Sequence, residues 1–233
     1  MDQPDLDPAL HDQALRALER VNRISRSTSM LWGPIEELAR RTPGRPVRVL
    51  DLATGAGDIP VALWQRARRA GITLEIEACD RSDHALAHAR ERAERCGAKI
   101  RFFPWDALRG PLPNSYDIVV CSLFLHHLDT PDAVAVLRHM ANSARRLVLV
   151  NDLRRSISGW LLAWLVARVL TRSPVVHIDA PLSVAAAFTC AEAADLARQA
   201  GMAGATVRRR WPWRWLLTWH RPSSESNANV GKS

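Results

Sequence analysis

The chain has 233 residues, of which 47% are apolar and 24% charged, which is enough for one domain with a sizeable core and short for two. This balance excludes disorder as the main state, and no apolar run reaches the roughly 20 residues of a membrane-spanning helix. The net charge of +8 suits an anionic partner, although a generally solvated arginine surface is the favoured explanation. The four cysteines have no metal-binding spacing and the acidic N-terminus does not resemble a secretory signal, so we expect a reduced cytoplasmic protein without a metal.

Apolar periodicity predicts helices at 9–24 and 30–40, followed by a turn-rich break at 42–46. From residue 47 onward, short apolar strands alternate with helices, which predicts a parallel sheet covered on both faces. The expected strands are 47–52, 73–79, 100–104, 116–122 and 146–151, and the expected helices between them are 58–70, 82–96 and 131–143.

The remainder departs from this alternation. An apolar helix is expected at 157–171, and Thr189 with Glu192 forms a capping box for a helix that ends at Gly201. Two strands, at about 204–210 and 213–220, are expected to close the fold. The predicted organisation is one domain over 1–222, divided into a helical cap (1–45), a core (46–152) and a lid insertion with closing strands (153–222), followed by a disordered tail (223–233).

The glycine-rich segment after the first strand, Asp51-Leu-Ala-Thr-Gly-Ala-Gly-Asp58, is the most informative stretch. Gly55 and Gly57 permit a tight turn and a close ligand approach at the carboxyl edge, where open α/β sheets bind ligands. A dinucleotide fingerprint requires a small third residue where this chain has Pro60, and the Gly-Lys-Ser/Thr of a phosphate-binding loop is absent. The Asp51 carboxylate suits a cationic amine or sulfonium instead.

Two further acids follow the next strands. Asp80 can accept hydrogen bonds from a ribose diol, and Asp106 can accept one from an adenine amino group. The sequence therefore predicts a nucleoside site shared by the first three strand ends.

Together these residues resemble the class I S-adenosylmethionine-dependent methyltransferases, over about residues 46–152 by motif, and the loop is most similar to the ubiquinone/menaquinone C-methyltransferase branch. The resemblance implies an α/β fold with a doubly wound, mostly parallel seven-stranded Rossmann-like sheet, an N-terminal helical cap and a helical insertion. It also implies S-adenosyl-L-methionine as cofactor, with the glycine loop on its methionine part, Asp80 on the ribose, Asp106 and Ala107 on the adenine, and Ser122 beneath the methyl group. The cofactor-binding residues implied in this way are Asp51, Ala53, Gly55, Gly57, Asp80, Arg81, Asp106, Ala107 and Ser122.

Candidate bases follow the fourth and fifth strands, which end at the same edge of the sheet. His126, His127 and Asp152 would help if the acceptor is protonated at neutral pH, as a phenol is. Adjacent histidines point in different directions, so one of the two is expected to face the core, and a purely structural pair stays open as an alternative.

The acceptor is expected to be small and lipophilic. His177, Asp179 and Trp160 are candidate substrate residues in the insertion, and Trp160 belongs to a helix that is apolar almost all round. The stretch 208–219 alternates Arg and Trp, which suits a lipid interface or an aromatic pocket. The alternative is that its Trp residues pack beneath the sheet with Arg outside, so peripheral membrane contact stays open.

O-methylation of a phenol or hydroxyl in secondary-metabolite or quinone-like chemistry is the leading prediction, because the His-His/Asp group offers a base. C-methylation of an aromatic or quinone ring follows closely. A nicotinamide oxidoreductase and a non-catalytic cofactor- or nucleic-acid-binding protein are the rivals from other classes. Nucleic acid is disfavoured because Cys-Ser-Leu-Phe at 121–124 differs from the loop that binds exocyclic base amines. The sequence leaves the oligomeric state open.

Overall fold

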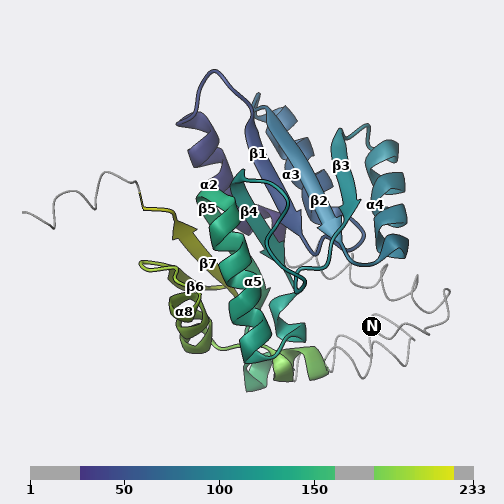
Figure 1. Ribbon diagram of the computed structural model, residues 1–233. Coiled ribbons are helices and arrows are strands. Elements are labelled where there is room, and N and C mark those ends of the chain that lie inside the picture. Colours follow the sequence, from purple (N-terminus) through teal and green to yellow (C-terminus); the bar gives the residue numbers. More distant parts are fainter. Residues whose placement is uncertain (1–26, 161–180, 223–233) are drawn as a thin grey trace, which may run out of the picture.

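The computed structural model describes residues 27–160 and 181–222, in which seven strands form one sheet in the order β3-β2-β1-β4-β5-β7-β6 (Figure 1). The strands are β1 (Val47–Leu52), β2 (Leu74–Asp80), β3 (Ile100–Pro104), β4 (Tyr116–Ser122), β5 (Ala144–Leu153), β6 (Thr206–Arg210) and β7 (Arg214–His220). The helices are α2 (Ser27–Arg40), α3 (Asp58–Arg69), α4 (Asp83–Arg95), α5 (Thr130–Ser143) and α8 (Cys190–Gln199), with one 3-10 turn, η1 (Leu125–His127).

The first five strands run parallel, and β7 pairs antiparallel with both β5 and β6. The chain order reverses between β1 and β4, which places the switch point of the sheet beside the glycine loop. This confirms the predicted doubly wound, mostly parallel seven-stranded sheet. Because β7 is antiparallel, its first residue lies at the same edge as the last residues of β4 and β5.

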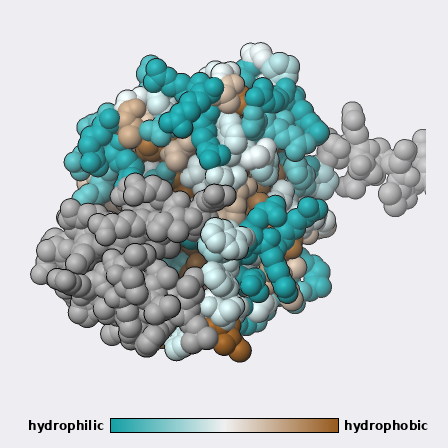
Figure 2. Space-filling model, turned by 180° about the vertical axis from the view of Figure 1, so that it is seen from behind, coloured by the Kyte–Doolittle hydropathy of each residue, from teal (hydrophilic) through white to brown (hydrophobic). Residues whose placement is uncertain are grey.

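Buried apolar side chains form one cluster on each face of the sheet. Leu31 of α2 and Leu63 of α3 belong to the first cluster, and Leu137 of α5 and Leu196 of α8 belong to the second. In Figure 1, α5 crosses in front of the sheet while α3 lies behind it. Seen from behind, the described surface is largely hydrophilic with scattered small apolar areas (Figure 2). Burial on both faces explains why the central strands are nearly continuous apolar runs.

Most predicted elements are confirmed to within a few residues, with two differences of substance. α2 begins at Ser27, so Pro34 lies inside the helix, where it cannot donate the usual backbone hydrogen bond. β5 extends to Leu153 because its last residues pair with β7. The predicted helix at 9–24, most of the one at 157–171 and the predicted tail lie outside the described residues.

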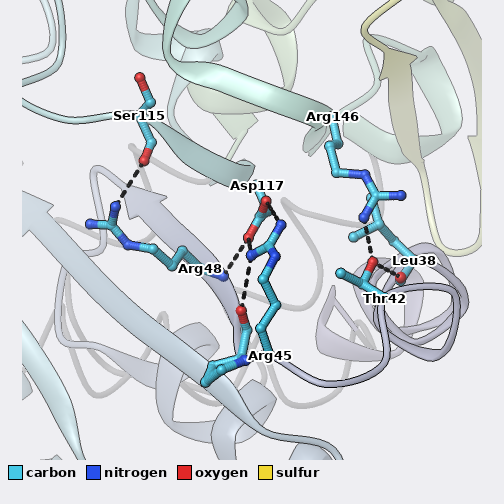
Figure 3. A network of polar contacts seen from close by, with 8 residues as sticks. Leu38, Thr42, Arg45, Arg48, Ser115, Asp117 and Arg146 are labelled. Atoms are coloured by element: carbon cyan, nitrogen blue, oxygen red, sulfur yellow. Dashed lines mark hydrogen bonds and ion pairs between the residues drawn. The ribbon is translucent and has the colours of Figure 1, made fainter. Parts of the chain in front are cut away.

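A polar network ties the strands together at the edge where they begin (Figure 3). Arg45 donates to both carboxylate oxygens of Asp117 at 2.7 Å, and the backbone N–H of Arg48 donates to the same carboxylate at 3.0 Å. Arg146 of β5 donates to the Thr42 hydroxyl after α2. This network lies at the amino-terminal edge of the parallel strands, so it fixes β1, β4 and β5 without entering the opposite edge.

Candidate active site

The glycine loop leaves β1 with three residues in the left-handed region: Ala53 at φ 55°, Gly55 at φ 54° and Gly57 at φ 73°. A Cβ on Gly57 would lie 2.8 Å from the Cβ of Ala89 in α4, so this glycine is required for helix packing. A Cβ on Gly55 would meet nothing within 4 Å. Gly55 therefore presents bare backbone to open space at the carboxyl edge of the sheet.

Asp51 lies beneath this loop, 2% exposed, and accepts a hydrogen bond of 2.5 Å from the Thr54 hydroxyl. Burial raises the pKa of Asp51 to about 8, against the opposing effect of the Thr54 hydrogen bond, and repulsion from Asp58 and Asp80 adds to the rise. Three carboxyl groups therefore share one region. A bound cation would relieve their repulsion and favour the ionised form of Asp51.

Asp80, at the end of β2, fixes the loop from the other side. Its two carboxylate oxygens accept from the backbone N–H of Gly55 at 2.8 Å and of Ser82 at 3.0 Å. Each oxygen retains a further lone pair for a ligand hydroxyl. Arg81, the next residue, is exposed.

The loop after β3 is positioned by the same strand end. The backbone N–H of Trp105 donates to the carbonyl of Asp80 at 2.9 Å, and the Asp106 carboxylate accepts from the backbone of Leu108 at 3.0 Å. Ala107 is buried, and its carbonyl contacts the His139 ring of α5 at 3.1 Å. The acids predicted for ribose and adenine thus stand on neighbouring, mutually bonded loops.

His126 and Asp152 form a buried pair. The Nδ1 atom of His126 lies 2.6 Å from a carboxylate oxygen of Asp152, and the backbone N–H groups of His126 and Leu153 also donate to that carboxylate. Burial opposes ionisation of Asp152, but the charge and hydrogen bond of His126 outweigh it and lower its pKa. His126 is buried and His127 is exposed, so one of the two faces the core as expected. Their rings do not diverge, however, because the ring centroids lie 4.1 Å apart with the planes tilted by 40°.

The arginines of the last strands depart from the prediction. Trp215 and Trp219 are buried, as the packing alternative expects, and Arg208–Arg210 are exposed. Arg214, however, is only 1% exposed. The expectation that the arginines lie outside is therefore wrong at this position. Burial lowers the pKa of Arg214 to about 10, while Asp152 and then Asp58 raise it. Nothing in the alternating Arg/Trp pattern distinguishes this arginine from its neighbours.

The substrate residues expected in the insertion are only partly visible. Trp160 is 38% exposed in the short helical segment 157–160, whereas His177 and Asp179 lie outside the described residues. Ser122, at the end of β4, is half-buried, and its hydroxyl oxygen has no hydrogen-bond partner among the described residues.

These features fit the expected cofactor. The backbone at Gly55 is open to a ligand. Asp51 would supply negative charge for a sulfonium or ammonium group, and Asp80 would offer acceptors to a diol. In the described ranges no cluster of three His, Cys, Asp or Glu side chains is arranged to bind a metal ion. Nor does any helix within them have the length and apolar character needed to cross a membrane.

Residues 49–146 match a family model described as a methyltransferase domain. Demethylmenaquinone methyltransferase of Thermus thermophilus is 36% identical over 108 residues, which make up 46% of this chain and 47% of that protein. The chain therefore matches about half the length of this curated relative.

Solved structures share the fold of this chain. The S-adenosylmethionine-dependent methyltransferase SibL aligns with a TM-score of 0.68 at 21% identity, over 93% of this chain and 60% of SibL. Magnesium protoporphyrin IX methyltransferase from Synechocystis, with bound SAH, aligns at 0.55 and 16% identity, over 94% and 90% of the two chains. Residues 49–146 are thus similar to a methyltransferase domain, and the chain has the fold seen in solved S-adenosylmethionine-dependent methyltransferases.

Proposed function

We propose that the protein transfers the methyl group of S-adenosylmethionine to a small lipophilic acceptor, and that the methylated atom is the oxygen of a phenol or similar hydroxyl. The observation that carries this proposal is the shared edge of the sheet. The Asp51–Gly55–Asp80 cradle and the buried His126–Asp152 pair both lie at the carboxyl ends of neighbouring strands.

When bound, the cofactor supplies a methyl group already activated on a cationic sulfur. The protein then has to orient the two reactants, and good orientation contributes roughly 7–11 kcal/mol. Asp80 holds the Gly55 backbone in place, and the buried Asp51 provides the negative charge that retains a cation. These residues bind and position, and neither needs to exchange a proton with the acceptor.

His126 is the proposed base. With its Nδ1 donating to Asp152 at 2.6 Å, the ring is held in the tautomer whose Nε2 is the proton acceptor. Asp152 stabilises the imidazolium that forms when the acceptor hydroxyl loses its proton. Asp152 is therefore a positioning residue for His126.

The test is turnover with S-adenosylmethionine and a panel of phenols and quinols, followed as S-adenosylhomocysteine release. We expect His126→Gln to lower kcat by about 10²–10⁴-fold with little change in KM. Asp152→Asn should alter the pH profile, and His220→Gln, an exposed histidine on the far edge of β7, is the matched control. Near-normal turnover of His126→Gln across about pH 6 to 9, or a loss that follows His127→Gln instead, would contradict the assignment.

C-methylation of an aromatic or quinone ring is the second candidate, favoured by the similarity to a demethylmenaquinone methyltransferase. S-adenosylmethionine labelled with ¹³C in its methyl group separates the two. An oxygen-bound methyl and a carbon-bound methyl have well-resolved NMR shifts, so the product identifies the atom.

We also propose that the acceptor is taken from a lipid surface. Ile157 and Trp211 are 84% and 72% exposed, and the two segments that carry them are joined by the 2.8 Å hydrogen bond from Trp213 to Ser158. Flotation of the full chain with phosphatidylcholine/phosphatidylglycerol vesicles tests this. If wild type and Trp211→Ser are both recovered entirely in the lipid-free fraction, the proposed contact with a lipid surface is contradicted.

A further inference from the structure

Three polar side chains at the carboxyl edge of the sheet carry buried atoms that have no hydrogen-bond partner among the described residues. The hydroxyl oxygen of Ser122, both side-chain polar atoms of Asn151 and the Nη1 atom of Arg214 form no hydrogen bond within the described residues. Asn151 is 0% and Arg214 1% exposed. Buried polar groups are normally satisfied, because each unsatisfied one costs free energy, so a cluster of three requires a reason.

The three side chains share one face of the sheet. Because strand residues alternate between the two faces, residues two positions apart in a strand lie on the same face. The residues two positions from Ser122, Asn151 and Arg214 all belong to the core that packs on α2 and α3; they are Val120, Leu149 and Leu216.

They are also neighbours. Ser122 and Asn151 are paired in register across β4 and β5. Asn151 pairs with Leu216 of β7, so Arg214, two residues earlier, lies diagonally across from Asn151. Diagonal neighbours are separated by about 7–8 Å, which a long side chain spans easily. A guanidinium, an amide and a hydroxyl therefore converge.

The guanidinium charge of Arg214 is opposed by neighbouring carboxylates but not by a contact ion pair among the described residues. Within the described ranges no carboxylate lies at ion-pair distance from Arg214, although Asp152 and Asp58 both interact with it electrostatically. Asp58 is the first residue of α3, next to the glycine loop. The guanidinium therefore lies within the electrostatic field of carboxylates on both sides of the switch point of the sheet. A buried cation without a bonded anion is costly.

We propose that Arg214, Asn151 and Ser122 bind an anionic oxygen of the acceptor: a carboxylate, a phenolate or an enolate. A planar guanidinium with an amide and a hydroxyl beside it is a donor set that matches such a group. The acids attributed to the cofactor stand on β1, β2 and the loop after β3, whereas this cluster stands on β4, β5 and β7, across the switch point. The inference rests on the proposed methyl transfer and narrows its substrate to lipophilic molecules that carry an ionised oxygen.

The test uses the full chain loaded with S-adenosylhomocysteine and two probes of equal shape, 1-naphthoate and its neutral amide, 1-naphthamide. We expect the wild type to bind 1-naphthoate about tenfold to a hundredfold more tightly than 1-naphthamide, the range for a hydrogen bond to a charged group. Arg214→Met should abolish this preference and change the affinity for S-adenosylhomocysteine by less than about threefold. Arg210→Met removes the exposed arginine that pairs with Arg214 in register, and should change neither affinity.

The outcomes are distinct. If the wild type binds S-adenosylhomocysteine but binds the two probes equally or not at all, this inference alone is overturned. If the wild type does not bind S-adenosylhomocysteine, the proposed function is overturned as well. If Arg214→Met weakens the binding of S-adenosylhomocysteine as strongly as the binding of 1-naphthoate, the anion that Arg214 binds is the cofactor carboxylate and the inference is wrong. Asn151→Leu, which keeps the guanidinium, should lower the preference partially and serves if Arg214→Met does not fold.

Discussion

The two glycines of the loop predict opposite consequences for the same substitution. Gly57 has φ 73°, and an added Cβ would lie 2.8 Å from the Cβ and 3.1 Å from the Cα of Ala89. The second of these atoms is backbone of α4 and cannot move without shifting the helix. Gly55 has φ 54° but open space around its missing Cβ.

The magnitudes follow from these contacts. A left-handed conformation costs a residue with a Cβ about 1–2 kcal/mol. Overpacking adds about 1–3 kcal/mol where the neighbour cannot yield. Gly57→Ala should therefore lower the free energy of unfolding by about 2–5 kcal/mol, and Gly55→Ala by about 1–2 kcal/mol. The added methyl of Gly55→Ala projects into the space assigned to the cofactor, so its main effect should be on binding.

Urea unfolding of both variants, combined with calorimetric titration of S-adenosylhomocysteine, checks the pair. We expect Gly57→Ala to be the less stable variant, and Gly55→Ala, although better folded, to lose more affinity for S-adenosylhomocysteine. Equal stabilities would show that Ala89 does not confine Gly57. Normal affinity in Gly55→Ala would show that the cofactor does not lie against this part of the loop.

Three further predictions concern single side chains. The pKa of Asp51 is about 8, and a bound cation lowers it. The affinity for S-adenosylmethionine should therefore rise as the pH increases toward 8, by at most about tenfold per pH unit, and should level off above pH 8. Asp51→Asn should flatten this pH dependence in calorimetric titrations. Asp117→Ala removes a buried acceptor from the half-exposed Arg45 and should cost about 2–3 kcal/mol in urea unfolding, less than for a fully buried pair. Burial opposes the low pKa of Asp117, but Arg45 lowers it, so this contribution should be present above about pH 4 and lost as the pH falls through that pKa. Thr189→Ala breaks the capping box of α8 and should cost about 1 kcal/mol in the same assay, with no change in cofactor affinity.

The core of the fold is readable from the sequence because its signals are local. Apolar runs mark β1 and β4, the Thr189–Glu192 pair marks the start of α8, and the acids near the ends of β1 and β2 mark the site edge. Each of these features depends on a few consecutive residues. The hydrogen bonds from Gly55 to Asp80 and from His126 to Asp152 then join predicted residues from different elements.

What escapes sequence reasoning depends on pairing between distant strands. Asn151 and Arg214 are polar residues at strand ends, a position that usually predicts exposure, yet the antiparallel pairing of β5 and β7 buries both. The extension of β5 to Leu153 has the same cause. Likewise, the open space at Gly55 and the contact at Gly57 differ because of α4, not because of the loop sequence.

The position of the antiparallel strand β7 also affects the order in which the protein can fold during its synthesis. A growing polypeptide can assemble β1 to β5, with the glycine loop and Asp80, well before residue 214 is synthesised. The guanidinium of Arg214 and the buried indole of Trp215 reach their places only when β7 inserts between β5 and β6. A fragment truncated before β7 would therefore leave the flank of β5 uncovered. The proposed acceptor site would form last.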